Sequence, residues 1–258
     1  MNSKSVRLRE FIRSNDGRSL IVDASAGLWL GAAPGLEHFS AAIQPILPLI
    51  DGLVASPGQA GRLLGRTQAE AALLVRGDWT NALRPPDFAL PPETIQHLSL
   101  LEAGEALDLG ASGLVLYFLL GHEEQIEAGC LLRAVQAALQ GGKAGLPLII
   151  DVQPVGPRVV NRPKAIQLGV SYALESGADG VAIPWPGRNE FSEIQKMAAG
   201  SPVWLAPAAL STAAGELEQA LELGGCGLWL DVEIFSLPDP AATLAAFASQ
   251  VHQLAPAG

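Results

Sequence analysis

Short apolar runs alternate with longer segments of helical period along the whole chain. Eight runs rich in Val, Ile and Leu have the length of buried strands, and they cover residues 19–25, 49–55, 71–76, 113–119, 146–152, 180–184, 203–206 and 227–231. The segments between them predict helices centred near residues 40, 62, 102, 130, 168, 194, 217 and 245. This alternation of strand and helix is typical of parallel βαβ units.

Three of the predicted helices end in a small-residue turn that leads directly into a strand, at 109–113, 176–180 and 223–227. Glycine suits such a turn because a helix C-terminus often needs a positive φ. A doubly wound open sheet would more often carry a GxGxxG motif after its first strand, whereas this first strand runs into Asp23-Ala24-Ser25-Ala26-Gly27. We therefore predict an α/β fold, a single (β/α)8 TIM barrel.

The chain has 258 residues, of which 49% are apolar, and this length is typical of one such barrel. No linker divides it, so we assign residues 1–258 to one domain. The proline-rich stretch 84–93 follows the third strand, on the face where barrel enzymes carry their sites. It is either a lid or a rigid surface loop.

The formal net charge of −10 argues against nucleic acid or an anionic membrane as a partner. Cys130 and Cys226 have no CxxC or Cys/His spacing, so we expect buried apolar side chains rather than metal ligands. The first residues lack the apolar centre of a signal peptide, and no apolar run reaches the roughly 20 residues that span a bilayer. The expected location is the cytoplasm.

Polar side chains cluster at the predicted carboxyl ends of the strands: Asp23, Arg76, Asp78, Asp151, Gln153, Asp231 and Glu233. Strands one and eight become neighbours when the barrel closes, so Asp23, Asp231 and Glu233 could hold a divalent cation through oxygen ligands. Hydrogen bonds to loop amides and water are the simpler interpretation, because no histidine or fixed motif joins these residues. We therefore predict neither a metal nor a cofactor.

Basic side chains follow strands five and six, at Arg158, Arg162, Lys164 and Arg188. They form either an anion pocket or a solvated rim with scattered ion pairs. Trp79 and Trp185 either stack on a ligand or pack over the loops. His122 is the only histidine expected at this face, and beside two glutamates it suits a helix N-terminus better than a catalytic base.

Several segments resemble the archaeal-type class I fructose-bisphosphate aldolases and their relatives in the deoxyribose-phosphate and tagatose-bisphosphate aldolase superfamily. The similar segments are 20–23, 34–37, 56–58, 120–124, 177–184, 234–235 and 239–240. Their order and spacing across eight units carry the resemblance, which implies the same barrel fold.

The resemblance also implies a set of catalytic positions. In that family a lysine on strand six forms a Schiff base, a tyrosine on strand five transfers a proton, and an aspartate on strand one assists. This chain keeps Asp23 at the aspartate position but has Ala182 at the lysine and Gln153 at the tyrosine position. A methyl group cannot form an imine, and an amide can orient a hydroxyl but cannot supply a proton.

The family's phosphate site, glycine-rich backbone after strands seven and eight with a following arginine, is also altered. The corresponding segments are Ala206-Pro207-Ala208-Ala209 and Asp231-Val232-Glu233. Proline removes an amide donor and the carboxylates repel phosphate, so a phosphosugar is not expected to bind there as in relatives.

Another lysine could replace the missing amine. The sequence has four, and Lys4, Lys143 and Lys196 are expected away from the catalytic face. Only Lys164, after strand five, begins on the correct face, which keeps a Schiff base on Lys164 as an alternative.

Two functions follow. In the first, the chain is a divergent class I aldolase-family protein, a pseudoenzyme without Schiff-base activity that binds a small polar metabolite at the barrel mouth. In the second, it is an active carbon–carbon lyase on a sugar-like or phosphorylated substrate that uses a mechanism without lysine. The expected catalytic residues are Asp23 and Gln153. The expected ligand-binding residues are Arg76, Asp78, Arg158, Trp185, Arg188, Asp231 and Glu233. The expected partners are a small-molecule ligand and, because such relatives assemble into rings, further copies of the chain.

Overall fold

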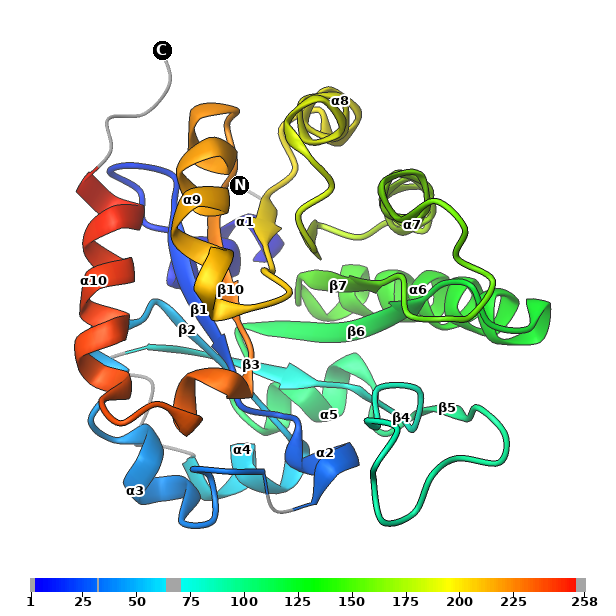
Figure 1. Ribbon diagram of the computed structural model, residues 1–258, viewed down its shortest axis with the longest axis horizontal. Coiled ribbons are helices and arrows are strands. Elements are labelled where there is room, and N and C mark those ends of the chain that lie inside the picture. The colour runs from blue at the N-terminus through cyan, green and yellow to red at the C-terminus, as the bar shows by residue number, and fades with distance from the viewer. Residues whose placement is uncertain (1–2, 32, 64–70, 254–258) are drawn as a thin grey trace.

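Eight parallel strands close into a barrel in the computed structural model, which describes residues 3–31, 33–63 and 71–253 (Figure 1). Around the ring the strands follow the order β1-β10-β9-β8-β7-β6-β3-β2. Their bounds are β1 Ser19–Asp23, β2 Gly52–Ala55, β3 Ala72–Arg76, β6 Gly113–Leu119, β7 Leu148–Gln153, β8 Gly180–Ile183, β9 Val203–Leu205 and β10 Gly227–Leu230. The chain is therefore a (β/α)8 TIM barrel, as the alternation of strand and helix predicts.

Helices surround the barrel. They are α2 Gly27–Leu30, α3 Phe39–Ile43, α4 Pro57–Leu63, α5 Ala103–Asp108, α6 Glu124–Ala144, α7 Arg162–Glu175, α8 Arg188–Ala198, α9 Leu210–Glu222 and α10 Pro240–Gln253, with 3-10 turns η1 Leu47–Leu49 and η2 Val232–Ser236. The glycines that precede β6, β8 and β10 adopt the expected positive φ, 78° at Gly110, 94° at Gly177 and 92° at Gly224. The helix near residue 62 is described only as far as Leu63, and the start of the strand expected at 71–76 is Ala72.

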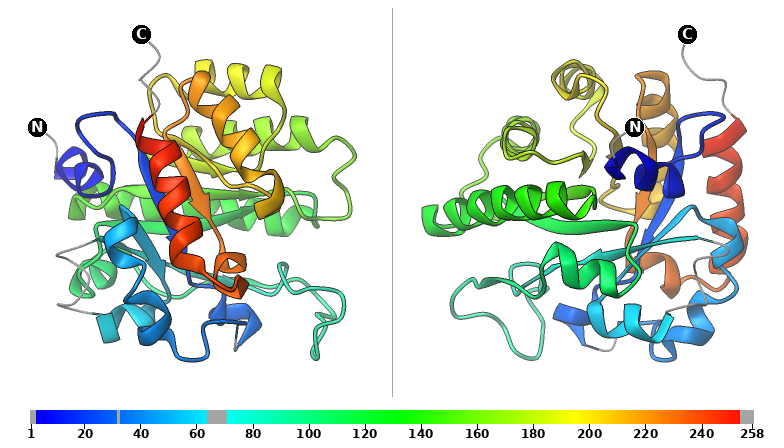
Figure 2. Two further views of the ribbon diagram at one scale, coloured as in Figure 1. Left: turned by 60° about the vertical axis from the view of Figure 1, so that its left-hand side comes forward. Right: turned by 180° about the vertical axis from the view of Figure 1, so that it is seen from behind.

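Besides the short α2, η1 and η2, two elements were not expected from the sequence. The first is α1, Ser3–Phe11, whose Phe11 is buried in the cluster that fills the barrel interior. The second is the antiparallel hairpin of β4, Asp78–Thr80, and β5, His97–Ser99, which brackets the proline-rich stretch. Figure 2 shows α1 and this hairpin at opposite ends of the barrel. The hairpin lies at the mouth, because Trp79 Nε1 donates to the carbonyl of Leu28 in α2 at 2.7 Å.

Two separate apolar layers follow from the alternation of side chains along each strand. Outward-facing residues pack against the helices. Inward-facing residues fill the barrel: Phe11, Ile21, Val54, Ala72, Leu74, Val115, Ile149, Ala182, Trp204, Cys226 and Trp229. Gly180 makes room for the largest of these, since a Cβ there would lie 2.8 Å from Trp204 Cζ3. Both cysteines are buried and free, as expected.

Candidate functional site

A cavity of about 280 Å³ opens at the carboxyl ends of the barrel strands. Its polar wall is made by Asp23, Tyr117, Asp151, Gln153, Arg162 and Asp231. Its apolar wall includes Trp29 from α2, Leu83 from the hairpin loop, Trp229 from β10 and the segment Ala206-Pro207-Ala208. Trp29 Nε1 is buried and has no hydrogen-bond partner among the described residues, so this wall carries an unused donor.

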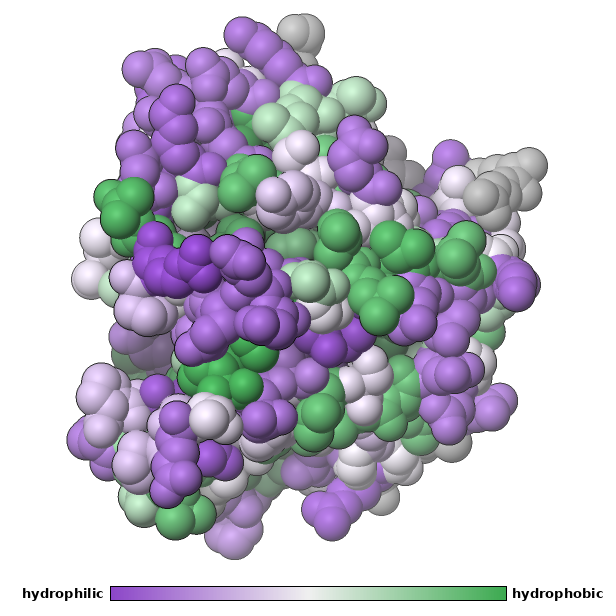
Figure 3. Space-filling model, turned by 90° about the vertical axis from the view of Figure 1, so that its right-hand side faces the viewer, coloured by the Kyte–Doolittle hydropathy of each residue, from purple (hydrophilic) through white to green (hydrophobic). Residues whose placement is uncertain are grey.

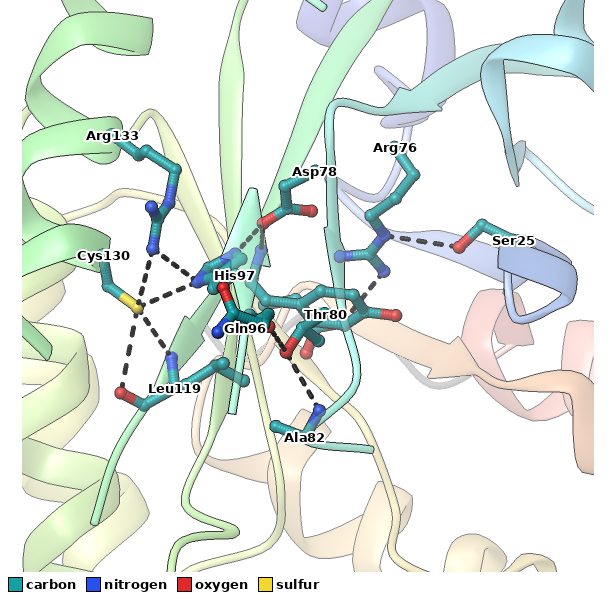
Figure 4. A network of polar contacts seen from close by, with 12 residues as sticks. Ser25, Arg76, Asp78, Thr80, Ala82, Gln96, His97, Leu119, Cys130 and Arg133 are labelled. Carbon is teal, nitrogen blue, oxygen red and sulfur yellow. Dashed lines mark hydrogen bonds and ion pairs between the residues drawn. The ribbon is translucent and has the colours of Figure 1, made fainter. Parts of the chain in front are cut away.

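A buried ion network forms the floor beside this cavity. Arg76, at the end of β3, is fully buried, and its NH2 group donates to Asp23 Oδ2 and, at 3.1 Å, to Asp151 Oδ2. Its Nε donates to Ser25 Oγ at 3.3 Å (Figure 4). Ser25 in turn donates its Oγ–H and its N–H to Asp23 Oδ1, at 2.5 and 2.9 Å. One guanidinium thus holds two carboxylates from opposite sides of the ring, and the coulombic attraction of both outweighs burial, which by itself would lower the pKa, so that the pKa of Arg76 is raised.

Tyr117 completes this floor from β6. The guanidinium carbon of Arg76 lies 3.7 Å from the centre of the Tyr117 ring, a cation–π contact in a desolvated setting. Burial raises the pKa of the phenol, so its hydroxyl keeps its proton at neutral pH. Because Tyr117 lines the cavity, this hydroxyl is positioned as a hydrogen-bond donor toward a ligand.

Asp151 is the most perturbed carboxyl group of the cavity wall. Burial raises its pKa to about 6, against the opposing attraction of Arg76. Gln153 Nε2 donates to Asp151 Oδ1 at 2.7 Å, so the amide orients the carboxyl group. A carboxyl group that titrates near pH 6 inside a pocket is suited to proton transfer or to a ligand that donates hydrogen bonds.

Among the residues that the structure describes, no primary amine lies in the cavity wall. Ala182, on β8, is fully buried and belongs to the cluster that fills the barrel, so its methyl group points inward. Lys4 pairs with Asp179 at 2.8 Å, before the start of β8. Lys164 begins α7 and lines a different surface hollow, together with Arg158. The remaining lysines lie on helices, Lys143 in the last turn of α6 and Lys196 in the last turn of α8.

Carboxylates of the chain itself cap the helices that follow strands β9 and β10. Glu233 Oε2 accepts from the backbone N–H of Leu210, the first residue of α9, at 3.2 Å. Asp231 Oδ1 accepts from the backbone N–H of Glu233 at 2.8 Å, at the start of η2. Helix N-termini attract anions, and at this rim of the barrel the chain's own carboxylates already accept hydrogen bonds from these N-termini.

Asp78 lies outside the cavity. It is fully buried beneath the β4–β5 hairpin, where Oδ2 accepts from the backbone N–H of Tyr117 and contacts His97 Nε2, both at 2.7 Å (Figure 4). Arg133 NH2 and Cys130 Sγ lie 2.7 and 3.3 Å from His97 Nδ1. This network connects the hairpin to α6 and fixes the backbone of Tyr117, so Asp78 supports the cavity wall from behind without lining it.

Three other predicted ligand-binding residues also lie away from the cavity. Arg158 donates to the carbonyl of His122 at 3.1 Å, on the rim beside α6. Trp185 packs against Phe191 of α8 with ring centres 5.3 Å apart. Arg188 pairs with Glu222 at 2.8 Å on the exposed surface. The contacts of Arg158 and Arg188 fit the interpretation of a solvated rim with scattered ion pairs.

The cavity therefore brings together Asp23, Gln153 and Asp231 from the predicted set, with Arg76 directly behind them. Sequence reasoning missed Tyr117 and Trp29. An available signal was the alternation along β6, which places Tyr117 inward like Val115, but tyrosine is common in cores and the hairpin that covers it was not foreseen.

Among the described residues, no group of three or more histidine, cysteine or acidic side chains is arranged to hold a metal ion, Asp23, Asp231 and Glu233 included. In the same part of the chain, no helix has both the length and the apolar character that crossing a membrane requires.

No protein-family model matches the sequence, and a search of curated proteins returns no match. Solved structures match along nearly the whole chain. A Schiff-base-forming fructose-1,6-bisphosphate aldolase has a TM-score of 0.79 at 24% identity and covers 97% of this chain and 100% of its own. An archaeal fructose-1,6-bisphosphate aldolase with its catalytic lysine bound to a carbinolamine has a TM-score of 0.78 at 23% identity, covering 97% and 99%. The fructose-bisphosphate aldolase of Slackia heliotrinireducens has 0.74 at 16%, covering 97% and 86%.

At these identities the likeness establishes the fold, a TIM barrel built as in class I aldolases. The resemblance found in the sequence is confirmed at this level.

Proposed function

We propose that this protein binds a small polar metabolite at the mouth of the barrel and does not form a Schiff base with it. The observation that carries the proposal is Ala182, whose methyl group occupies the barrel interior on the strand where the resemblance implies a lysine. Imine formation needs an amine nucleophile, and none of the four lysines lines the cavity. The unpartnered indole N–H of Trp29 and the hydroxyl of Tyr117 supply donors for a polar ligand.

The ligand that fits this cavity best lacks a phosphate group. In the wall that the described residues form, the carboxylates of Asp23, Asp151 and Asp231 outnumber the one cation, Arg162. Arg76 is already engaged by Asp23 and Asp151, and the N-terminus of α9 is capped by Glu233. A phosphate would therefore meet net negative charge and a helix N-terminus that already binds a carboxylate, whereas hydroxyl groups would find both donors and acceptors.

Borohydride trapping tests the absence of imine chemistry. The protein is incubated with dihydroxyacetone or dihydroxyacetone phosphate, reduced, and weighed by intact-mass spectrometry, with a Schiff-base-forming aldolase as positive control. The expected mass is that of the unmodified chain. An adduct mapped to Lys164 or any other lysine would contradict the proposal.

Calorimetry with matched pairs tests the ligand class. Dihydroxyacetone, glyceraldehyde and fructose are compared with their phosphate esters, and inorganic phosphate is included. Only the unphosphorylated members are expected to bind the wild type. In the same titrations the Glu233→Ala variant should bind the esters more tightly than the wild type does. The control variant Glu218→Ala, which removes an exposed carboxylate on α9, should not. If the esters bound the wild type more tightly, the proposed ligand class would be rejected. If none of these compounds bound, the binding function would be rejected.

A second function has one specific observation in its favour. Asp151, with a pKa raised to about 6 by burial, lies in the cavity wall beside Tyr117 and Asp23 and is suited to act as a general acid or base. A carbon–carbon lyase that moves protons through Asp151 without an imine would use this arrangement. Retro-aldol cleavage of unphosphorylated ketoses, lost in Asp151→Asn and retained in Glu218→Ala, would establish it; no cleavage by the wild type would reject it.

A further inference from the structure

Helix α6 is packed with its small residues inward and its large apolar residues outward. Of its 21 residues, those buried against the barrel are Cys130, Ala134, Ala137 and Gly141. The side chains of Leu131, Leu132, Val135 and Leu139 are 42%, 59%, 37% and 64% exposed. A helix that only covered its own barrel would be expected to have the opposite distribution, because burial of leucine contributes more than burial of alanine.

The outward residues form a seam with coiled-coil spacing. Ala128, Leu132, Val135, Leu139 and Gly142 are all exposed and follow one another at intervals of four, three, four and three residues. Val135 lies in the middle of the seam, with one leucine on each side and one small residue at each end. Nothing lies within 4 Å of the position that a Cβ at Gly142 would take, so no contact within the chain accounts for this helical glycine.

The surface around the seam extends its apolar area. Leu98 on β5 is 52% exposed, and Leu168 and Tyr172 on the neighbouring α7 are 44% and 36% exposed. Figure 3 shows hydrophobic side chains gathered on the side of the molecule that carries α6, α7 and the hairpin. Exposed apolar surface of this kind on a soluble fold usually marks a binding surface.

We propose that this surface, the α6 seam, is a two-fold interface with a second copy of the same chain, in which the two α6 helices pack antiparallel near Val135. A two-fold interface must be complementary to itself, and a seam with one leucine on each side of Val135 and a small residue at each end suits this requirement. The charges agree with it: the first turn of α6 carries Glu124 and Glu127 and the last turn carries Lys143, so antiparallel packing brings acidic ends to basic ends. The small residues at both ends of the seam let the helices approach closely.

Light scattering coupled to size-exclusion chromatography tests the interface on the full chain. The wild type should have a mass at least twice the 26.8 kDa of one chain, and Leu139→Glu should lower that mass by half or more. The matched control is Leu90→Glu, because Leu90, in the hairpin loop, is 69% exposed, as far as Leu139, and lies outside the seam. It should leave the mass unchanged.

Cross-linking gives a second readout that does not require the fold to tolerate a new charge at position 139. Val135 lies where the two-fold axis would pass, so Val135→Cys should form an intermolecular disulfide under mild oxidation, whereas Glu218→Cys on α9 should not. A wild type of 26.8 kDa would overturn the proposal and leave the seam to a different partner. A folded Leu139→Glu variant with unchanged mass, or equal cross-linking at both cysteines, would place the contact between copies elsewhere.

Discussion

The two ends of the barrel interior are built from the same strands and differ in chemistry. Toward the amino ends, Trp204 packs on Phe11 with ring centres 6.1 Å apart, and α1 closes the barrel. Toward the carboxyl ends, Asp23 and Asp151 converge on Arg76. Along β1 or β7, a step of two residues leads from the apolar environment to the ionic one. In TIM barrels the amino-terminal end serves stability and the carboxyl-terminal end function, and this molecule divides its interior in the same way.

Removal of the Arg76 guanidinium, which Asp23 and Asp151 share, should have the largest effect on stability. Arg76→Met leaves Asp23 and Asp151 buried without their partner, and we expect a loss of about 3–5 kcal/mol in the free energy of unfolding at pH 7. Urea unfolding measures it. Arg188→Met removes an exposed arginine paired with Glu222 and should cost less than about 1 kcal/mol. Equal losses for the two variants would show that burial does not make the Arg76 ion network more important for stability than an exposed ion pair.

The protonation of Asp151 should make stability depend on pH in an unusual direction. Its folded-state pKa of about 6 lies above the ordinary 3.8, so between pH 4 and 6 the folded state binds more protons than the unfolded state. Stability should then fall as pH rises through this window, by on the order of 3 kcal/mol from this group. Unfolding of the wild type and Asp151→Asn at pH 4, 5, 6 and 7 isolates this contribution, and identical pH profiles would refute it.

A conservative substitution at the closed, amino-terminal end should lower stability by less and should not affect ligand binding at the mouth. Trp204 Nε1 donates to Ser19 Oγ at 2.7 Å, so Trp204→Phe removes this buried hydrogen bond and leaves a small cavity beside Gly180. We expect a loss of about 2 kcal/mol, and part of it should return in the double variant with Ser19→Ala. Ligand affinity, measured by calorimetry, should stay the same; a change there would show that the two ends are coupled.

The smallest effect on stability is expected at the mouth. Tyr117→Phe keeps the ring over Arg76 and removes only the hydroxyl, so the free energy of unfolding should change by less than about 0.5 kcal/mol. Affinity for an unphosphorylated ligand should fall roughly 2- to 10-fold, the value of one hydrogen bond. Unchanged affinity would remove Tyr117 from the binding site.

Much of the fold was readable in the sequence, and less of the site. The strand–helix alternation and the glycine turns predicted the barrel, and the resemblance to class I aldolases placed Ala182 at the position of the inward lysine. Asp78 was expected at the mouth because it follows β3 by two residues. Gly77 ends the alternation of β3. A Cβ there would lie 2.6 Å from Leu114 Cδ1, so a larger residue would displace that leucine side chain, and the chain turns here into β4, whose first residue is Asp78.

By itself the sequence determined which side chains face the barrel interior, because that depends on a period of two along each strand, which is a local property. Only the tertiary structure decided that Arg76 would hold Asp23 and Asp151, residues 53 and 75 positions away along the chain, and that Glu233 would cap α9. Those partnerships arise when the ring of strands closes and brings distant carboxylates within reach of one cation or one helix end. The strength of each contact then depends on burial, which no single segment sets.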